Sequence, residues 1–257
     1  MDKKKSQIIR TSAILLLAGY GKRIASITSN PKCLLKINNQ SIIERNLNIL
    51  KALGIKNITL VLGFKKELIK KEVVKFIRYF NFNYSYNKNY IKFGNSYSLL
   101  IGLKKTKGNV IIFDGDLIYS KKILENFIIN GHESSFLIGK TSIKDIECAK
   151  ALIDKSGFIK KTIDKRRIYK YELKKYKFIG EAIGILKISN KIRKLMIDGL
   201  KDFLKTKKNL ILNWEHFMNE FLKNNAIMYN KTVNSQWIEI DTKEDYFRAI
   251  SLFKKND

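Results

Sequence analysis

Short apolar runs alternate, in the first half of the chain, with segments whose apolar residues recur at helical spacing. Four runs of apolar or alternating residues predict strands, and they lie at 12–17, 57–62, 82–86 and 109–113. Three segments of helical periodicity predict helices, and they lie at 41–53, 66–79 and 96–105. This alternation favours an α/β, Rossmann-like fold, in which helices cover both faces of a mostly parallel sheet.

The second half of the chain has a different pattern. From about residue 134 to 186 it is strand-rich, and glycines mark the turn points at Gly157, Gly180 and Gly184. The remaining segments predict helices at 191–204 and 214–222, a last strand at 235–240 and a closing helix from about Lys243. No stretch resembles a linker, so we expect a single domain over residues 1–257 that includes a smaller strand-rich subregion.

Positive charge dominates the composition, with 51 lysine and arginine residues against 23 acidic ones and a formal net charge of +28. Such basicity is typical of proteins that bind nucleic acid or anionic membranes. The lysines are nevertheless scattered through every segment, and no RNA-binding motif accompanies them. We therefore favour a general compositional bias and expect no nucleic-acid partner. A basic surface would also attract small anionic substrates such as a nucleoside triphosphate (NTP).

Nothing in the sequence indicates a membrane-spanning protein or a zinc-binding protein. No apolar run approaches the roughly 20 residues that span a bilayer. The first ten residues are polar and basic, and the apolar stretch Ala13–Leu17 is too short for a secretory signal. We therefore expect a cytoplasmic protein without a membrane span. Cysteine and histidine each occur only twice, which is too few at these spacings for a structural zinc site.

A glycine turn follows the first predicted strand, in the string Leu17-Ala18-Gly19-Tyr20-Gly21-Lys22-Arg23. Glycines let a backbone approach a phosphate, the amides of such a turn bind anions, and Lys22 and Arg23 add positive charge. An ordinary strand-to-helix turn would show the same two glycines. The string fits neither the Walker pattern, which needs a longer loop, nor the dinucleotide fingerprint, which needs a third glycine.

The wider string resembles the signature of the sugar-nucleotide and cytidylyl nucleotidyltransferases, Leu-Ala-Ala-Gly-x-Gly-x-Arg followed by Pro-Lys. Here it reads Leu16-Leu17-Ala18-Gly19-Tyr20-Gly21-Lys22-Arg23, then Pro31-Lys32-Cys33-Leu34-Leu35. The resemblance implies that the loop wraps the NTP triphosphate. It also implies that Arg23 and Lys32 are catalytic and stabilise charge on the transferring phosphate, with Lys22 assisting. Leu17 departs from the usual alanine, at a loop whose backbone also lines the base pocket.

Two further sites place carboxylates at the ends of predicted strands. The string Asp114-Gly115-Asp116 ends one strand, where close carboxylates suit a magnesium–NTP site, although an Asp-Gly turn is the alternative interpretation. By resemblance to the family, Asp116 holds Mg²⁺ and Asp114 supports it on the nucleotide side. The string Trp237-Ile238-Glu239-Ile240-Asp241-Thr242 likewise resembles the element that provides the second metal ligand, here Asp241. A helix cap at Asp241 or Thr242 is compatible with that role.

The middle of the chain resembles the cytidylyltransferases that act on phosphocholine, 2-aminoethylphosphonate and related head groups. Four strings carry this match, namely Tyr86-Asn87-Lys88-Asn89-Tyr90, Gly94-Asn95-Ser96-Tyr97-Ser98-Leu99, Gly180-Glu181-Ala182-Ile183-Gly184-Ile185 and Asn213-Trp214-Glu215. The resemblance implies CTP as donor. It also implies nucleotide contacts at Asn95 and Ser98, and acceptor contacts at Glu181, Trp214 and Glu215.

Each of these middle residues has a structural alternative. Asn95 and Ser98 are candidates for capping the helix predicted at 96–105. Trp214 has the spacing of a core aromatic residue on an amphipathic helix, and Glu181 could be a surface charge after a turn. A cationic amine on the acceptor would favour carboxylates and aromatic faces.

The sequence thus predicts transfer of CMP from CTP to a small phosphorylated or phosphonylated acceptor, with Mg²⁺ as cofactor and pyrophosphate as the second product. A sugar-1-phosphate nucleotidyltransferase of the same fold is the first alternative. A non-catalytic, basic RNA-binding protein is the second, and it would bind nucleic acid in a salt-sensitive manner. The sequence indicates no oligomeric state.

Overall fold

The computed structural model describes residues 11–232 and 236–253. The basic segment Met1–Arg10 and the expected first residue of the last strand, Ser235, lie outside the described residues. Within the described part, no helix combines the length and the apolar character that crossing a bilayer requires.

Four parallel strands form the half of the sheet built from the first part of the chain. The central strand, β1 (Thr11–Leu17), lies between β4 (Asn57–Leu62) and β6 (Asn109–Asp114), and β5 (Asn81–Tyr86) pairs with β4. Every residue of β1 is buried, as expected of a strand covered on both faces. All four strands predicted in this region are confirmed, with bounds that differ by one residue at most.

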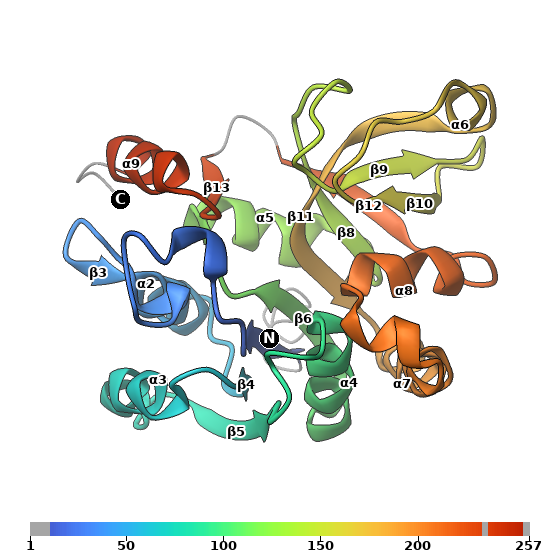
Figure 1. Cartoon of the computed structure of the whole chain (residues 1–257). Helices are drawn as coiled ribbons and strands as arrows, with labels where there is room; N and C mark the ends of the chain where they lie inside the picture. Colours follow the sequence, from blue (N-terminus) through green and yellow to red (C-terminus); the bar gives the residue numbers. More distant parts are fainter. Residues whose placement is uncertain (1–10, 233–235, 254–257) are drawn as a thin grey trace.

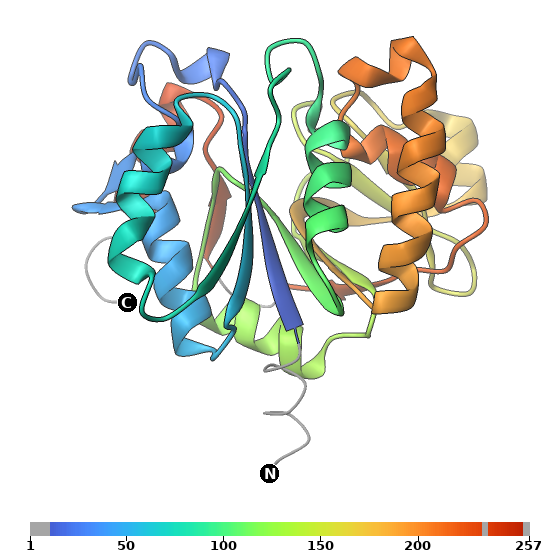
Figure 2. The same ribbon diagram turned by 90° about the horizontal axis from the view of Figure 1, so that it is seen from below.

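Helices cover both faces of this sheet (Figure 2). One face carries α2 (Ile42–Ala52) and α3 (Lys66–Val73), and the other carries α4 (Asn95–Lys105) and α7 (Asn190–Lys205). Their apolar side chains fill two separate cores, one on each side of the sheet. The predicted fold class is therefore confirmed. The helix predicted at 66–79 is shorter than expected, because α3 gives way to the 3₁₀ turn η3 (Val74–Phe76).

The second half of the chain extends the same sheet with strands that pair mostly in an antiparallel manner (Figure 1). The long strand β11 (Lys177–Ile188) pairs with β6, and so joins the two parts. Beyond it lie β8 (Ser135–Gly139), β9 (Lys150–Ile153), β10 (Ile159–Ile163) and β12 (Met228–Lys231). Of these strands, β12 runs parallel to β8. The short helix α6 (Lys170–Lys175) connects β10 to β11.

The remaining elements are short. The helices are α5 (Lys121–Asn130), α8 (Trp214–Phe221) and α9 (Lys243–Leu252), and the 3₁₀ turns are η1 (Lys22–Ile24), η2 (Lys32–Leu34) and η4 (Lys207–Ile211). The small strands are β2 (Lys36–Ile37), β3 (Gln40–Ser41), β7 (Leu117–Tyr119) and β13 (Trp237–Glu239). The last predicted strand, β13, pairs with β7 in a separate two-stranded sheet, which brings the end of the chain beside the end of β6.

Candidate active site

The glycine turn after β1 leaves room for a lysine beneath it. Gly21 precedes η1 and has a left-handed backbone, with φ of 68°. A Cβ atom at this position would lie 3.0 Å from Cγ of Lys32 and would crowd it. Glycine is therefore required both for the conformation of the turn and for the passage of Lys32 under it.

Lys32 joins two carboxylates that lie far away in the sequence. Its Nζ donates to Oδ2 of Asp116 at 2.7 Å, to Oδ1 of Asp241 at 2.7 Å and to the backbone carbonyl of Ile240 at 2.9 Å. Arg23 reaches the other oxygen of Asp241, with Nη2 2.5 Å from Oδ2. The structure thus brings together four residues that the sequence predicted as catalytic or metal-binding.

The ionisation of this network follows from its burial and its opposite charges. Burial by itself would lower the pKa of Lys32, but the carboxylates of Asp116 and Asp241 raise it above its ordinary value. Burial likewise opposes ionisation of Asp241, yet the charges of Lys32 and Arg23 hold its pKa below the usual range. Lys32 and Asp241 are therefore both charged at neutral pH.

A third carboxylate completes an acidic triad. Oxygens of Asp116, Glu239 and Asp241 lie within 4.8 Å of one another, and Oδ1 of Asp116 is buried without a hydrogen-bond partner among the described residues. Burial and the neighbouring charges of Asp116 and Asp241 raise the pKa of Glu239 well above its ordinary value. A divalent cation would relieve both the repulsion and the unsatisfied oxygen, so the triad fits a hard metal such as Mg²⁺.

Asp114 lies apart from the triad and contacts the tryptophan of α8. The indole Nε1 of Trp214 lies 3.3 and 3.4 Å from its two carboxylate oxygens. Burial raises the pKa of Asp114 well above its usual range, and the charges of Glu215 and Asp116 add to the effect. Gly184 makes this arrangement possible, because a Cβ atom there would lie 2.6 Å from Oδ2 of Asp114.

These groups line a cleft of about 380 Å³ at the carboxyl ends of the parallel strands, where ligands of such sheets bind. Most of the residues predicted from the sequence lie in its lining, namely Ala18, Gly19, Gly21, Lys22, Arg23, Lys32, Asn95, Ser98, Asp114, Asp116, Glu215 and Asp241. The glycine turn that is predicted to bind the triphosphate, the acidic triad and the predicted acceptor carboxylate Glu215 therefore share one cavity.

Three predicted residues lie outside this lining. Leu17 lines a smaller adjoining cavity of about 60 Å³. Trp214 is 1% exposed and stacks on Phe136, so it supports the floor of the cleft from below, as its core interpretation predicts. Glu181 is buried in β11, in register with Lys150 of β9.

Asn95 caps a different helix from the one predicted. The residue before α4 is Gly94, in an extended conformation, and Asn95 is the first helical residue. Its Oδ1 accepts a hydrogen bond of 2.7 Å from the backbone amide of Trp214, at the start of α8. The expected cap of α4 at Asn95 is therefore wrong, because its side chain is engaged by the neighbouring helix. Ser98 accepts a hydrogen bond of 3.0 Å from Nδ2 of Asn87.

The cleft also contains charged residues that the sequence did not single out. Glu147, Asp164, Lys165 and Glu239 all line it. Lys165 follows β10 in a left-handed conformation, with φ of 44°, and its Nζ lies 3.4 Å from Oδ2 of Asp241. In the sequence it stands within a run of basic residues, and its position after a strand was the one signal that could have identified it.

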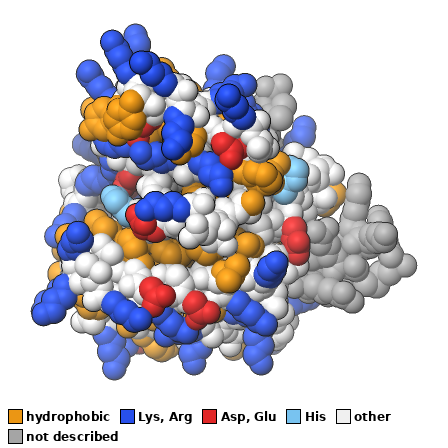
Figure 3. Space-filling view, turned by 90° about the vertical axis from the view of Figure 1, so that its right-hand side faces the viewer, with side chains coloured by type: hydrophobic (Ala, Val, Ile, Leu, Met, Phe, Trp, Pro, Cys, Tyr) orange, Lys and Arg blue, Asp and Glu red, His pale blue; other side chains and the backbone are white. Residues whose placement is uncertain are grey.

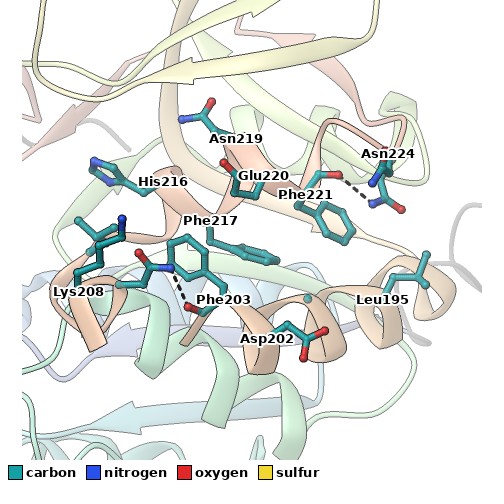
Figure 4. Close-up of a pocket in the computed structure, with 14 residues that line it drawn as sticks. Leu195, Asp202, Phe203, Lys208, His216, Phe217, Asn219, Glu220, Phe221 and Asn224 are labelled. Carbon is teal, nitrogen blue, oxygen red and sulfur yellow. Dashed lines mark hydrogen bonds between the residues drawn. The ribbon is translucent and has the colours of Figure 1, made fainter. Parts of the chain in front are cut away.

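A wider cavity, of about 1020 Å³, lies elsewhere, between α7 and α8 (Figure 4). The rings of Phe203, Phe217 and Phe221 form its apolar part, and polar side chains such as Asp202 and Glu220 lie around them. Figure 3 shows the side of the molecule that faces right in Figure 1, where basic side chains spread around an apolar band. None of the residues predicted as catalytic or metal-binding lines this second cavity, so we assign the chemistry to the smaller cleft.

Comparisons with known proteins identify the family of the chain. The profile of the MobA-like NTP transferase domain matches residues 13–142. A CTP:phosphoglutamine cytidylyltransferase from Campylobacter jejuni is 26% identical over 91% of this chain and 97% of that protein. A choline-phosphate cytidylyltransferase from Streptococcus pneumoniae is 32% identical over 44% of this chain and 48% of that protein.

The fold comparison extends over nearly the whole chain. The solved structure of a CTP:phosphocholine cytidylyltransferase from Streptococcus pneumoniae matches with a TM-score of 0.77 at 21% identity. The match covers 96% of this chain and 100% of that one. At this level of identity the likeness establishes a shared architecture.

Proposed function

The chain belongs to the family of nucleotidyltransferases with a MobA-like NTP transferase domain, and from this premise we propose that it is a cytidylyltransferase. It transfers CMP from CTP to a small phosphorylated or phosphonylated acceptor and releases pyrophosphate. The preference for CTP is supported by relatives of this chain that use CTP, among them the phosphoglutamine and choline-phosphate cytidylyltransferases.

The contact of Lys32 with two distant carboxylates carries this proposal. It assembles the triphosphate turn and the acidic triad at one point of the cleft, as transfer at an α-phosphorus requires. Asp116, Glu239 and Asp241 would hold Mg²⁺, which, when bound, would neutralise charge on the phosphate oxygens. Phosphate and phosphonate oxygens are already ionised near neutral pH, so no strong general base is needed.

The role of the protein side chains is then mainly to position charges. The amides of the turn at Gly21, together with Lys22 and Arg23, bind the triphosphate from the β1 side of the cleft. Lys32, held beneath that turn, contributes positive charge where charge builds up on the transferring phosphate. Acceptor and nucleotide are thereby held in line for attack.

Lys165 is suited to bind the phosphate of the acceptor, because it reaches the cleft from the strand-rich part of the chain and its Nζ lies beside the acidic triad, 3.4 Å from Oδ2 of Asp241. We expect Lys165→Ala to raise the KM for the acceptor roughly tenfold or more, since a hydrogen bond to a charged group is lost. The KM for CTP should change little, and steady-state kinetics measure both. Lys174→Ala, an exposed lysine on α6, is the matched control. An unchanged acceptor KM in Lys165→Ala would contradict this role.

The proposed function is tested by measuring pyrophosphate release with Mg²⁺ for each NTP and a panel of acceptors. The panel contains phosphocholine, phosphoethanolamine, 2-aminoethylphosphonate, phosphorylated amino-acid amides and sugar 1-phosphates. We expect pyrophosphate release with CTP and one of the acceptors other than the sugar 1-phosphates. Release with a sugar 1-phosphate and another NTP would favour the sugar-nucleotide alternative. Silence with every pair, from folded protein, would refute nucleotidyl transfer to these acceptors.

A further inference from the structure

The acceptor end of the cleft is lined by carboxylates from three different parts of the fold. Glu147 lies in the segment between β8 and β9, Asp164 follows β10, and Glu215 lies in the first turn of α8. Among the described residues on this side of the cleft, Lys165 is the one basic side chain in the lining. This end of the cavity is therefore suited to a ligand that has a phosphate near Lys165 and a cation near the carboxylates.

The Glu215 carboxylate has a buried oxygen, Oε2, that lacks a hydrogen-bond donor among the described residues. An unsatisfied buried carboxylate oxygen is costly. Burial, with the charges of Asp164 and Glu239, raises the pKa of Glu215 to about 8, against a smaller opposing effect of Lys165. A ligand that brings both a positive charge and an N–H donor would satisfy this oxygen.

The lining offers no aromatic face to such a cation. None of the described residues around the cleft is phenylalanine, tyrosine or tryptophan. The nearby Trp214 is buried, with its ring stacked on Phe136 and its Nε1 turned to Asp114. Quaternary ammonium groups have no N–H and are recognised mainly over aromatic rings, whereas a primary ammonium group has three donors for carboxylates.

We propose that the acceptor carries a primary ammonium group, which donates to the Glu215 carboxylate beside Asp164, and that this site discriminates against a quaternary ammonium. This inference rests on the proposed function, because it concerns the acceptor of the same reaction. It divides the amine-bearing head groups into two classes by the number of N–H donors. A site built to hydrogen-bond a group discriminates strongly against an analogue that lacks the hydrogen.

A methylation series tests the inference directly. Phosphoethanolamine, its N-methyl and N,N-dimethyl derivatives and phosphocholine share a phosphate and a positive charge, but their N–H donors decrease from three to none. We expect kcat/KM with CTP to fall at each step, by about a hundredfold or more over the series. An equal or rising kcat/KM would overturn the inference and leave cytidylyl transfer intact.

Two other outcomes of the series are equally decisive. Turnover confined to acceptors without an ammonium group, such as sugar 1-phosphates, would overturn the inference but not nucleotidyl transfer. The folded protein could also show no turnover with the series, 2-aminoethylphosphonate, phosphorylated amino-acid amides or sugar 1-phosphates. That result would overturn the proposed function, and the inference with it.

The variant Glu215→Gln tests whether the Glu215 carboxylate recognises the ammonium group or only supports the structure. The amide keeps the shape of the side chain and loses the charge, so we expect at least a tenfold higher KM for phosphoethanolamine and a flattened response to methylation. The KM for CTP should stay unchanged. Glu220→Gln, on the exposed side of the same helix and paired with Lys223 at 2.6 Å, is the control and should behave as the wild type. A Glu215→Gln variant that keeps the full wild-type discrimination would contradict the assignment.

Discussion

Replacing Asp241 by asparagine is expected to lower kcat for pyrophosphate release by about a thousandfold, the size of effect that follows the loss of one precisely placed electrostatic group. Asp241 contributes to the acidic triad and also accepts from Lys32 and pairs with Arg23. The amide would remove a negative ligand from the proposed metal site, and it takes from Arg23 and Lys32 the negative charge with which both pair at this position. Steady-state kinetics at saturating CTP and Mg²⁺ measure the effect.

The control must show that the loss is chemical and not a failure to fold. Asp202→Asn removes an exposed carboxylate that pairs with Lys205 at 2.7 Å on α7, and it should retain wild-type activity. Far-UV circular dichroism should give the same spectrum for both variants. Activity of folded Asp241→Asn within about threefold of the wild type would exclude Asp241 as a metal ligand.

Lys32→Met is expected to have the second large effect, a fall in kcat of roughly a hundredfold to a thousandfold. Methionine preserves much of the volume of the lysine but removes the charge that faces the transferring phosphate. Without Mg²⁺, Asp116 and Asp241 would then repel each other in a partly buried site, so the melting temperature should fall as well.

The effect of added Mg²⁺ on the melting temperature of Lys32→Met gives a second test of the role of Lys32. Added Mg²⁺ should raise the melting temperature of Lys32→Met more than that of the wild type, because the metal would restore the missing positive charge between the carboxylates. Lys104→Met, an exposed lysine on α4, should show neither effect. If Lys32→Met turns over CTP normally, Lys32 does not stabilise charge in the reaction.

Much of the fold could be predicted because its signals are local. The apolar run of β1 and the alternation that follows it determine strands and helices without reference to distant residues. The proximity of Asp116 and Asp241 was predicted through the resemblance to the nucleotidyltransferases, which implies that both residues hold the metal. The pairing of β13 with β7, which places Glu239 beside them, depends on contacts across the whole chain and could not be predicted from a local pattern.

The residues that were missed or misplaced share this dependence on tertiary structure. Lys165 resembles its basic neighbours in sequence and differs from them only in its backbone conformation and its distance to Asp241. Asn95 is a residue type that often caps helices and stands at the start of α4, but its side chain accepts a hydrogen bond from the backbone of α8 instead. The single domain, the cytoplasmic location and the individual site roles remain predictions.

The central claim is that the acceptor attacks the α-phosphorus of CTP, and the fate of a radioactive label at that atom tests it most directly. Folded protein is incubated with Mg²⁺, α-labelled CTP and phosphoethanolamine or 2-aminoethylphosphonate, and the products are separated by chromatography. The account predicts label in the anhydride that joins CMP to the phosphate or phosphonate of the head group, and none in pyrophosphate. Label recovered in CDP beside free phosphate, or left in CTP with every acceptor of the panel described above, would contradict it.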